Sequence, residues 1–211
     1  MDAFPRSAIL LALACAGVSA TVACGYSNGT SSAQPSPPSA CPTTAEKALR
    51  TLVRLVAERV IAADTVAAAK WNTSQPIENP AREKTVLDSA VSQAAKLGID
   101  QAFIQRIFED QITANKIVQQ TLHTQWRTQP AQQPNRHPDL ATEVRPLLDR
   151  VDRELLVAIG QAQPLLFSSR CGAVLDHEKA ATAKALSLDP IHRGGLDQAL
   201  AHICQNPSRG A

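Results

Sequence analysis

Apolar residues recur at helical spacing along most of the chain after residue 45. The first such segment, residues 46–70, contains no Gly or Pro, and its intervals of three and four residues place one side chain per turn on a single face. The members of this face are Leu52, Val56, Arg59, Ala63, Val66 and Lys70. The pattern predicts an amphipathic helix whose apolar stripe also carries two cations.

Arg59 and Lys70 are the unusual members of this stripe. At about 100° per residue, Lys70 returns to within about 20° of the direction of Arg59, about 16 Å further along the axis. Both side chains can therefore point into one interior space. A buried cation requires an anionic partner, and the stripe itself contains no carboxylate. The partner is either an acidic residue of another segment or a negatively charged ligand.

The remaining folded part is also dominated by helical signals. Gly98 suits the left-handed position after a helix end, Asp100 suits an N-cap, and Asp189-Pro190 is a cap followed by proline in the first turn. Further helices are predicted over about residues 81–98, 101–127, 140–166 (with Pro146 in its first turns), 171–185 and from 190 onward. We expect the Gly194-Gly195 pair to break the last of them.

Strand signals are missing from the same region. No segment alternates between apolar and polar residues, and no hairpin turn sequence separates two such segments. Residues 130–138 contain three prolines and form a long loop rather than a strand. The sequence therefore predicts an all-α fold, a single domain of about six helices covering residues 45–206.

The helix expected after Asp100 repeats the anomaly of the first. Ile104, Phe108 and Ile112 form an apolar face that Asn115 and Gln119 continue. A buried amide without a partner costs about 1 to 3 kcal/mol. The two amides either bond to each other or to water, or the stripe reaches the surface, or they face a ligand together with the cations of the first helix.

The N-terminal residues have the composition of an export signal. Residues 1–23 contain an early arginine and an apolar run that is short for a membrane span, so they are predicted to be a secretory leader. Cleavage after Ala20 or Ala23 competes with lipid attachment at Cys24. Residues 24–44 are rich in Gly, Ser, Thr and Pro and are predicted to be a disordered tether. Residues 207–211 form a short tail.

Composition excludes some partners. The 211 residues are 44% hydrophobic and carry a formal net charge of +2, which suits an ordinary globular domain. Lys and Arg are scattered along the chain, and aromatic residues, which stack nucleic-acid bases, make up only 3%. We therefore expect no nucleic-acid partner.

Export changes the interpretation of the cysteines. Cys171 and Cys204 both lie in the predicted helical C-terminal part, where an oxidising compartment would let them form a disulfide. Cys41, in the tether, is either free or paired with Cys24. The competing idea is zinc, although no CxxC or HxxxH spacing supports a metal site. The histidines near Cys204 that such a site would use are His177, His192 and His202.

Several short motifs together resemble the all-helical chorismate mutases. They are Glu58-Arg59, Lys70-Trp71, Pro76-Ile77-Glu78, Arg82-Glu83 and Phe108-Glu109-Asp110-Gln111-Ile112. The leader, an arginine in a later helix and the C-terminal cysteine pair are similar to the secreted branch of that family. The resemblance covers about residues 46–205.

The resemblance implies an enzyme that converts chorismate to prephenate. This Claisen rearrangement is a pericyclic step, so the resemblance implies no cofactor and no metal. It also implies a homodimer in which each pocket lies within one protomer. The chain contains no GxSxG, HExxH or Gly-rich phosphate loop that would indicate a different chemistry.

The resemblance also implies roles for the cationic residues. Arg59 matches the arginine that grips one substrate carboxylate, helped by an arginine of a later helix. Arg153 is the best match for that second arginine, and Arg150 is the alternative. Arg82 matches an arginine near the other end of the pocket, and Lys70 matches the lysine that donates to the ether oxygen of the substrate.

The uncharged and acidic positions complete the predicted site. Gln119 matches the second donor to the ether oxygen, and Glu83 matches the acceptor for the ring hydroxyl. Asn115 stands where a small hydroxyl residue is frequent in the family and can still bond a carboxylate. Val86, where several secreted members carry glutamine, only shapes the wall.

Two other classes of function stay open from the sequence. One is a non-catalytic helical protein that binds a small aromatic or carboxylate-bearing anion. The other is a structural helical module in which the internal charges neutralise one another. Incubation with chorismate separates the three, because only an enzyme forms prephenate.

Overall fold

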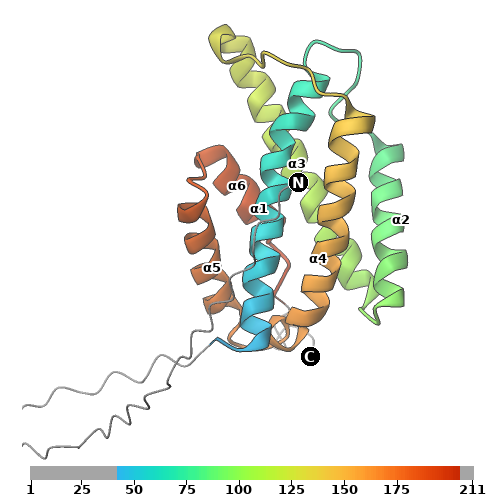
Figure 1. Cartoon of the computed structure of the whole chain (residues 1–211), viewed down its shortest axis with the longest axis vertical. Helices are drawn as coiled ribbons and strands as arrows, with labels where there is room; N and C mark the ends of the chain where they lie inside the picture. Colours follow the sequence, from blue (N-terminus) through green and yellow to red (C-terminus); the bar gives the residue numbers. More distant parts are fainter. Residues whose placement is uncertain (1–41, 205–211) are drawn as a thin grey trace, which may run out of the picture. The chain divides into compact units, whose positions relative to one another are not determined.

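The computed structural model describes residues 42–204, and within them all regular structure is helical (Figure 1). The predicted all-α class with six α-helices is therefore confirmed. The predicted leader, most of the tether, Cys24, Cys41 and residues 207–211 lie outside the described residues. The elements are α1 (Thr44–Lys70), α2 (Pro80–Lys96), α3 (Gln101–Thr128), η1 (Pro130–Gln132), η2 (Leu140–Val144), α4 (Arg145–Leu166), α5 (Cys171–Ala185) and α6 (Pro190–Ala199).

Helix α1 is the central element of the bundle. It contacts α3, α4, α5 and α6, and it lies between the α2/α4 side and the α5/α6 side of the view in Figure 1. Its start is fixed by a capping box, in which the Thr43 hydroxyl accepts from the Glu46 amide while the Glu46 carboxylate accepts from the Thr43 amide. Arg59 is the buried charged residue of this central helix, whereas Lys47 and Arg54 are exposed.

The ends of α2 and α3 follow local chemistry. The Asn79 side chain caps α2 by accepting from the amide of Arg82, and Pro80 occupies the first turn. Gly98 has a φ of 67°, as predicted for the residue that follows a helix end. The Asp100 carboxylate then caps α3 through the amide of Phe103 at 2.7 Å. The Asn79 cap thus fixes the start of α2, and Gly98 and Asp100 fix the short connection from α2 to α3.

The fourth predicted helix begins differently from the expectation. Instead of one α-helix from Leu140, the structure has a π-helical turn, η2, capped by Asp139, and α4 proper begins at Arg145. Pro146 lies in the first turn of α4, where its missing N–H leaves no unpaired donor.

The expected break at Gly194-Gly195 is wrong, because α6 continues through both residues. A Cβ on Gly195 would lie 2.9 Å from Val118 Cγ2 and 2.9 Å from Val60 Cγ1. The glycine is thus explained by the close approach of α6 to α1 and α3. In this position a missing side chain serves packing rather than chain flexibility.

The predicted disulfide is confirmed. Cys171, at the start of α5, is bonded to Cys204, after the end of α6, with a Cα–Cα distance of 5.7 Å. The zinc alternative is wrong for Cys204, since its sulfur is already bonded. Among residues 42–204 no cluster of His, Cys, Asp and Glu suits a metal ion, and none of the helices there has the length and apolar character to cross a membrane.

His192 gives α6 a pH-dependent attachment. Its Nε2 lies 2.8 Å from Asp64 Oδ1 on α1, and its Nδ1 lies 2.9 Å from Asp189 Oδ1 at the N-cap of α6. The hydrogen bond with Asp64, assisted by that with Asp189, raises the pKa of His192 from 6.5 to about 9. The charged imidazolium therefore joins two helices.

We expect the stability of the protein to fall as the pH rises from 6.5 to about 9. The pKa of His192 is higher in the folded than in the unfolded protein. The stabilisation is therefore complete below the unfolded pKa, and it is lost as the pH rises through the folded pKa. Both carboxylates are about half-exposed, and solvent screening limits the loss to about 1 kcal/mol. Urea denaturation over this range should show the decline in wild type and not in His192→Asn. The exposed His177→Asn serves as the control, and an unchanged pH dependence in His192→Asn would contradict the assignment.

Candidate active site

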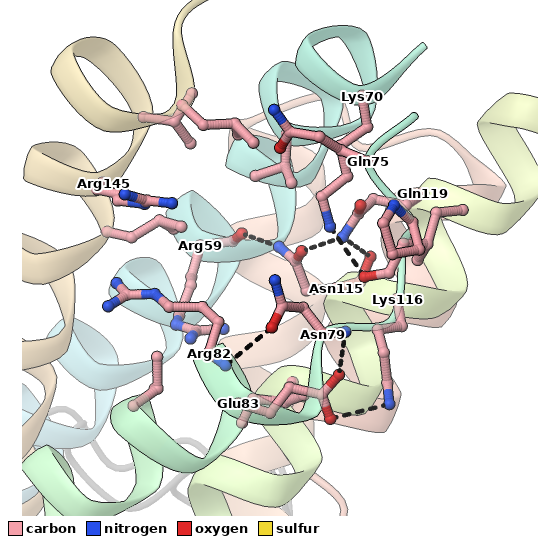
Figure 2. Close-up of a pocket in the computed structure, with 18 of the residues that line it drawn as sticks. Arg59, Lys70, Gln75, Asn79, Arg82, Glu83, Asn115, Lys116, Gln119 and Arg145 are labelled. Carbon is pink, nitrogen blue, oxygen red and sulfur yellow. Dashed lines mark hydrogen bonds and ion pairs between the residues drawn. The ribbon is translucent and has the colours of Figure 1, made fainter. Parts of the chain in front are cut away.

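A cavity of about 350 Å³ lies where α1, α2, α3 and α4 meet, closed by η2 and the connection between α1 and α2 (Figure 2). This volume suits a small ligand. The side chains that line it are Arg59, Val66, Lys70, Gln75, Pro76, Ile77, Asn79, Arg82, Glu83, Val86, Ile112, Asn115, Lys116, Gln119, Leu140, Val144, Arg145, Leu148 and Asp152. Six of the seven predicted binding residues are therefore brought together.

Arg59 is held firmly inside this cavity. Its side chain is only 6% exposed, its Nε donates to Asp152 Oδ1 at 2.7 Å, and its Nη1 donates to the carbonyl oxygen of Gln111 at 3.2 Å. The anionic partner expected from the sequence is thus partly an internal acid. The planar guanidinium still has unused N–H groups that can bind a ligand carboxylate.

Lys70 ends α1 on the opposite side of the cavity in Figure 2 from Arg82 and Arg145. Its ammonium donates to the carbonyl oxygen of Ile77 at 2.8 Å. Burial lowers the pKa of Lys70, and the nearby Glu83 carboxylate opposes this shift. A half-buried ammonium bonded to a neutral carbonyl is available to an anionic ligand.

Glu83 and Arg82 enter the cavity from the first turn of α2. The Glu83 carboxylate accepts from the backbone amide of Asn79 at 3.2 Å and from the Lys116 ammonium at 3.2 Å. Arg82 pairs with Asp149 at 3.3 Å, where both side chains are exposed. The carboxylate is therefore fixed in place, while the arginine is free to exchange partners.

Asn115 and Gln119 bond to each other, one of the alternatives that the sequence left open. The Gln119 amide donates to Asn115 Oδ1 at 2.7 Å and makes a longer contact of 3.4 Å with the backbone oxygen of Asn115. The Asn115 amide donates to the carbonyl oxygen of Arg59 at 3.4 Å. Gln119 is buried and its Oε1 has no partner. The Gln119 side chain thus has an unused acceptor, and one of its two donor contacts is long.

The predicted second arginine is not in the cavity. Arg153 is exposed and borders a neighbouring hollow between α2 and α4, and Arg150 pairs with Glu58 and Glu154 outside the cavity. On α4, Arg153 points about 100° away from Asp152 around the helix axis. The structure instead brings Arg145 into the lining, from the first turn of α4.

Sequence reasoning missed Arg145, Asp152 and Lys116 as lining residues. Arg145, Leu148 and Asp152 recur at three and four residues, so they share one face of α4. That spacing was readable, but it does not show which face of α4 points to the cavity. Lys116 directly follows Asn115 and carried no separate signal.

The electrostatic character of the cavity follows from its lining. Five basic side chains stand against the carboxylates of Glu83 and Asp152. An excess of positive charge in a partly buried space attracts an anion, and a dianion would neutralise most of it. Apolar walls from residues such as Val66 and Ile112 leave room for a carbon skeleton.

Comparisons with known proteins agree with this geometry. The family model for chorismate mutase type II matches residues 50–120. The secreted chorismate mutases of Mycolicibacterium smegmatis and Mycobacterium tuberculosis are 34% and 32% identical over 73% and 74% of this chain and 84% and 78% of their own lengths. The crystal structure of chorismate mutase from Burkholderia phymatum is 34% identical with a TM-score of 0.73, over 78% of this chain and all of that one. This chain belongs to the chorismate mutase family.

Proposed function

We infer that this protein is an exported chorismate mutase that converts chorismate to prephenate in the cavity between α1, α2, α3 and α4. The observation that carries this inference is the gathering of five basic side chains around one small cavity in a member of this family. Export is supported by the secreted relatives and by the leader-like residues 1–23.

The reaction requires shape and charge rather than a nucleophile. Chorismate is a dianion that must fold into a compact chair-like form, and the breaking ether bond gathers negative charge on its oxygen. Fixed cations hold the two carboxylates in the reactive geometry, and fixed donors stabilise the charge on oxygen. Only interactions that strengthen in the transition state raise kcat.

The arginines carry the binding of the carboxylates. Arg59 grips one carboxylate through its free N–H groups, and Arg145 takes the place predicted for Arg153. Arg82 leaves its exposed pairing with Asp149 to orient the ring side of the substrate. The planar fork of arginine suits this task because it matches a carboxylate with two parallel hydrogen bonds.

Lys70 and Gln119 serve the ether oxygen. Lys70 donates from its half-buried ammonium, and Gln119 donates through the amide hydrogen that makes only the 3.4 Å contact with Asn115. Glu83, fixed by Lys116 and the Asn79 amide, accepts from the ring hydroxyl.

The enzymatic step is tested directly. The mature protein, incubated with chorismate, should consume it and form prephenate at a rate proportional to protein concentration. Saturable binding without prephenate would indicate a non-catalytic anion-binding relative. No binding and no turnover would leave a purely structural module.

The pH profile of turnover is expected to be flat from mild acid to neutrality. The Gln119 amide donates at every pH, whereas a glutamate in its place must be protonated. On the alkaline side kcat/KM should decline with a midpoint below the ordinary lysine value of 10.5, because burial lowers the pKa of Lys70. Rates from about pH 5 to about pH 10 test this, and Gln119→Glu should lose activity toward neutral pH. A steep wild-type loss between mild acid and neutrality would remove Gln119 from the role.

Two finer properties are part of the proposal. The protein is a homodimer with one complete cavity per protomer, which light scattering of the mature protein would test. Its leader is removed on export to the periplasm or beyond, and mass spectrometry of the exported form distinguishes cleavage after Ala20 or Ala23 from a lipid anchor at Cys24.

A further inference from the structure

Asp152 is the one acidic side chain that α4 contributes to the cavity lining within residues 42–204. A carboxylate opposes the binding of a dianion, so its presence requires a reason. Its Oδ1 lies 2.7 Å from Arg59 Nε, and the two side chains are 14% and 6% exposed. This is the least exposed pairing between Arg or Lys and an acid in the described part of the chain.

The contacts fix the plane of the Arg59 guanidinium. Asp152 holds the Nε edge from α4, and the backbone oxygen of Gln111 holds Nη1 from α3. Bonds to two different atoms of one planar group prevent its rotation. The N–H groups that remain, above all those of Nη2, are available to a substrate carboxylate. Such a group needs no reorganisation when the ligand arrives.

The neighbouring pair on α4 behaves differently. Asp149, one turn before Asp152, pairs with Arg82 at 3.3 Å, and these side chains are 53% and 36% exposed. Solvent screens that pair, so a ligand can draw Arg82 away. The pair of Asp152 with Arg59 is enclosed, and breaking it would leave an uncompensated buried charge. Asp152 therefore stays bound to Arg59 while a ligand occupies the cavity.

We propose that Asp152 is a positioning residue that holds the guanidinium of Arg59 in the orientation required by the transition state. It acts through Arg59 and makes no contact with substrate. The inference rests on the proposed function. This role predicts different effects on kcat and KM. The Asp152 charge fixes Arg59, so its loss should lower kcat, but it also disfavours binding of a dianion, so its loss should not weaken affinity.

Asp152→Asn keeps the size of the side chain and an acceptor for Nε but removes the charge. We expect kcat to fall by about tenfold to a hundredfold, since the charge-assisted bond that fixes Arg59 is weakened. KM should stay unchanged or fall, because one negative charge leaves the cavity. Asp152→Glu, which restores the charge, should recover part of kcat. Asp88→Asn, an exposed change on α2 in a pair with Lys84, is the matched control and should leave both constants unchanged.

A second measurement separates positioning from general damage. In an Arg59→Lys background, which has no planar fork to orient, Asp152→Asn should cause little further loss of kcat. Additive losses in the double variant, a wild-type kcat in Asp152→Asn, or a raised KM with unchanged kcat would each overturn the positioning role. An inactive wild type would overturn the proposed function and this inference together, whereas an active wild type with any of those three results overturns the inference alone.

Discussion

Replacement of Lys70 by alanine is expected to lower kcat by about 10²- to 10³-fold while the protein stays folded. The ammonium lies on the Gln119 side of the cavity and donates to the neutral carbonyl of Ile77. An arriving ether oxygen that gains negative charge can take over this donor. Alanine offers no donor, so the transition state loses more than the ground state does.

The folded state should tolerate this change. Lys70 is the last residue of α1 and forms no ion pair within residues 42–204, and burial already disfavours its charge. Alanine also has high helix propensity. Steady-state kinetics with prephenate detection give kcat, and thermal unfolding gives stability. Lys47→Ala, an exposed change near the start of the same helix, is the control. Turnover at the wild-type rate in Lys70→Ala would remove Lys70 from catalysis.

Replacement of Arg59 by alanine is expected to impair binding, turnover and stability together. The guanidinium binds a substrate carboxylate in the proposed site, so KM should rise and kcat should fall, with kcat/KM reduced by about 10³-fold or more. The same change removes the partner of the Asp152 carboxylate, whose side chain is only 14% exposed. Breaking a buried ion pair from one side costs about 3 to 5 kcal/mol.

Two controls separate these contributions. Arg54→Ala removes an exposed arginine of the same helix and should change neither kinetics nor stability. Arg59→Ala combined with Asp152→Asn removes the orphaned charge, so it should regain part of the stability without regaining activity. Wild-type kcat/KM in Arg59→Ala would contradict the assignment of the cavity as the active site.

The part of the site on α1 could be predicted from the sequence, because positions along one helix have known relative directions. Arg59 and Lys70 lie on one uninterrupted helix, and a fixed rotation per residue relates their directions. Arg82 and Glu83 were predicted from the resemblance to the chorismate mutases, and the Asn79 cap seen in the structure places both in the first turn of α2. Local periodicity therefore predicted the helices and the face of α1 that lines the cavity, and the resemblance added the residues of α2.

The rest of the site depends on features that periodicity does not encode. Arg145 is the arginine of α4 that lines the cavity, rather than the predicted Arg153, because the packing of α4 against its neighbours decides which of its faces points inward. The pairing of Asp152 with Arg59 joins residues from distant parts of the chain. Packing between helices decides which residues of α4 line the cavity and which residues pair, and a single sequence does not reveal this packing.

The disulfide between Cys171 and Cys204 encloses α5 and α6, whereas every residue that lines the cavity lies between Arg59 and Asp152. The disulfide and the cavity thus belong to separate segments of the chain. In a reducing cytosol the protein would keep its cavity, but α5 and α6 would lose their disulfide. Formation of the disulfide on export should therefore affect the stability of the protein rather than its rate of turnover.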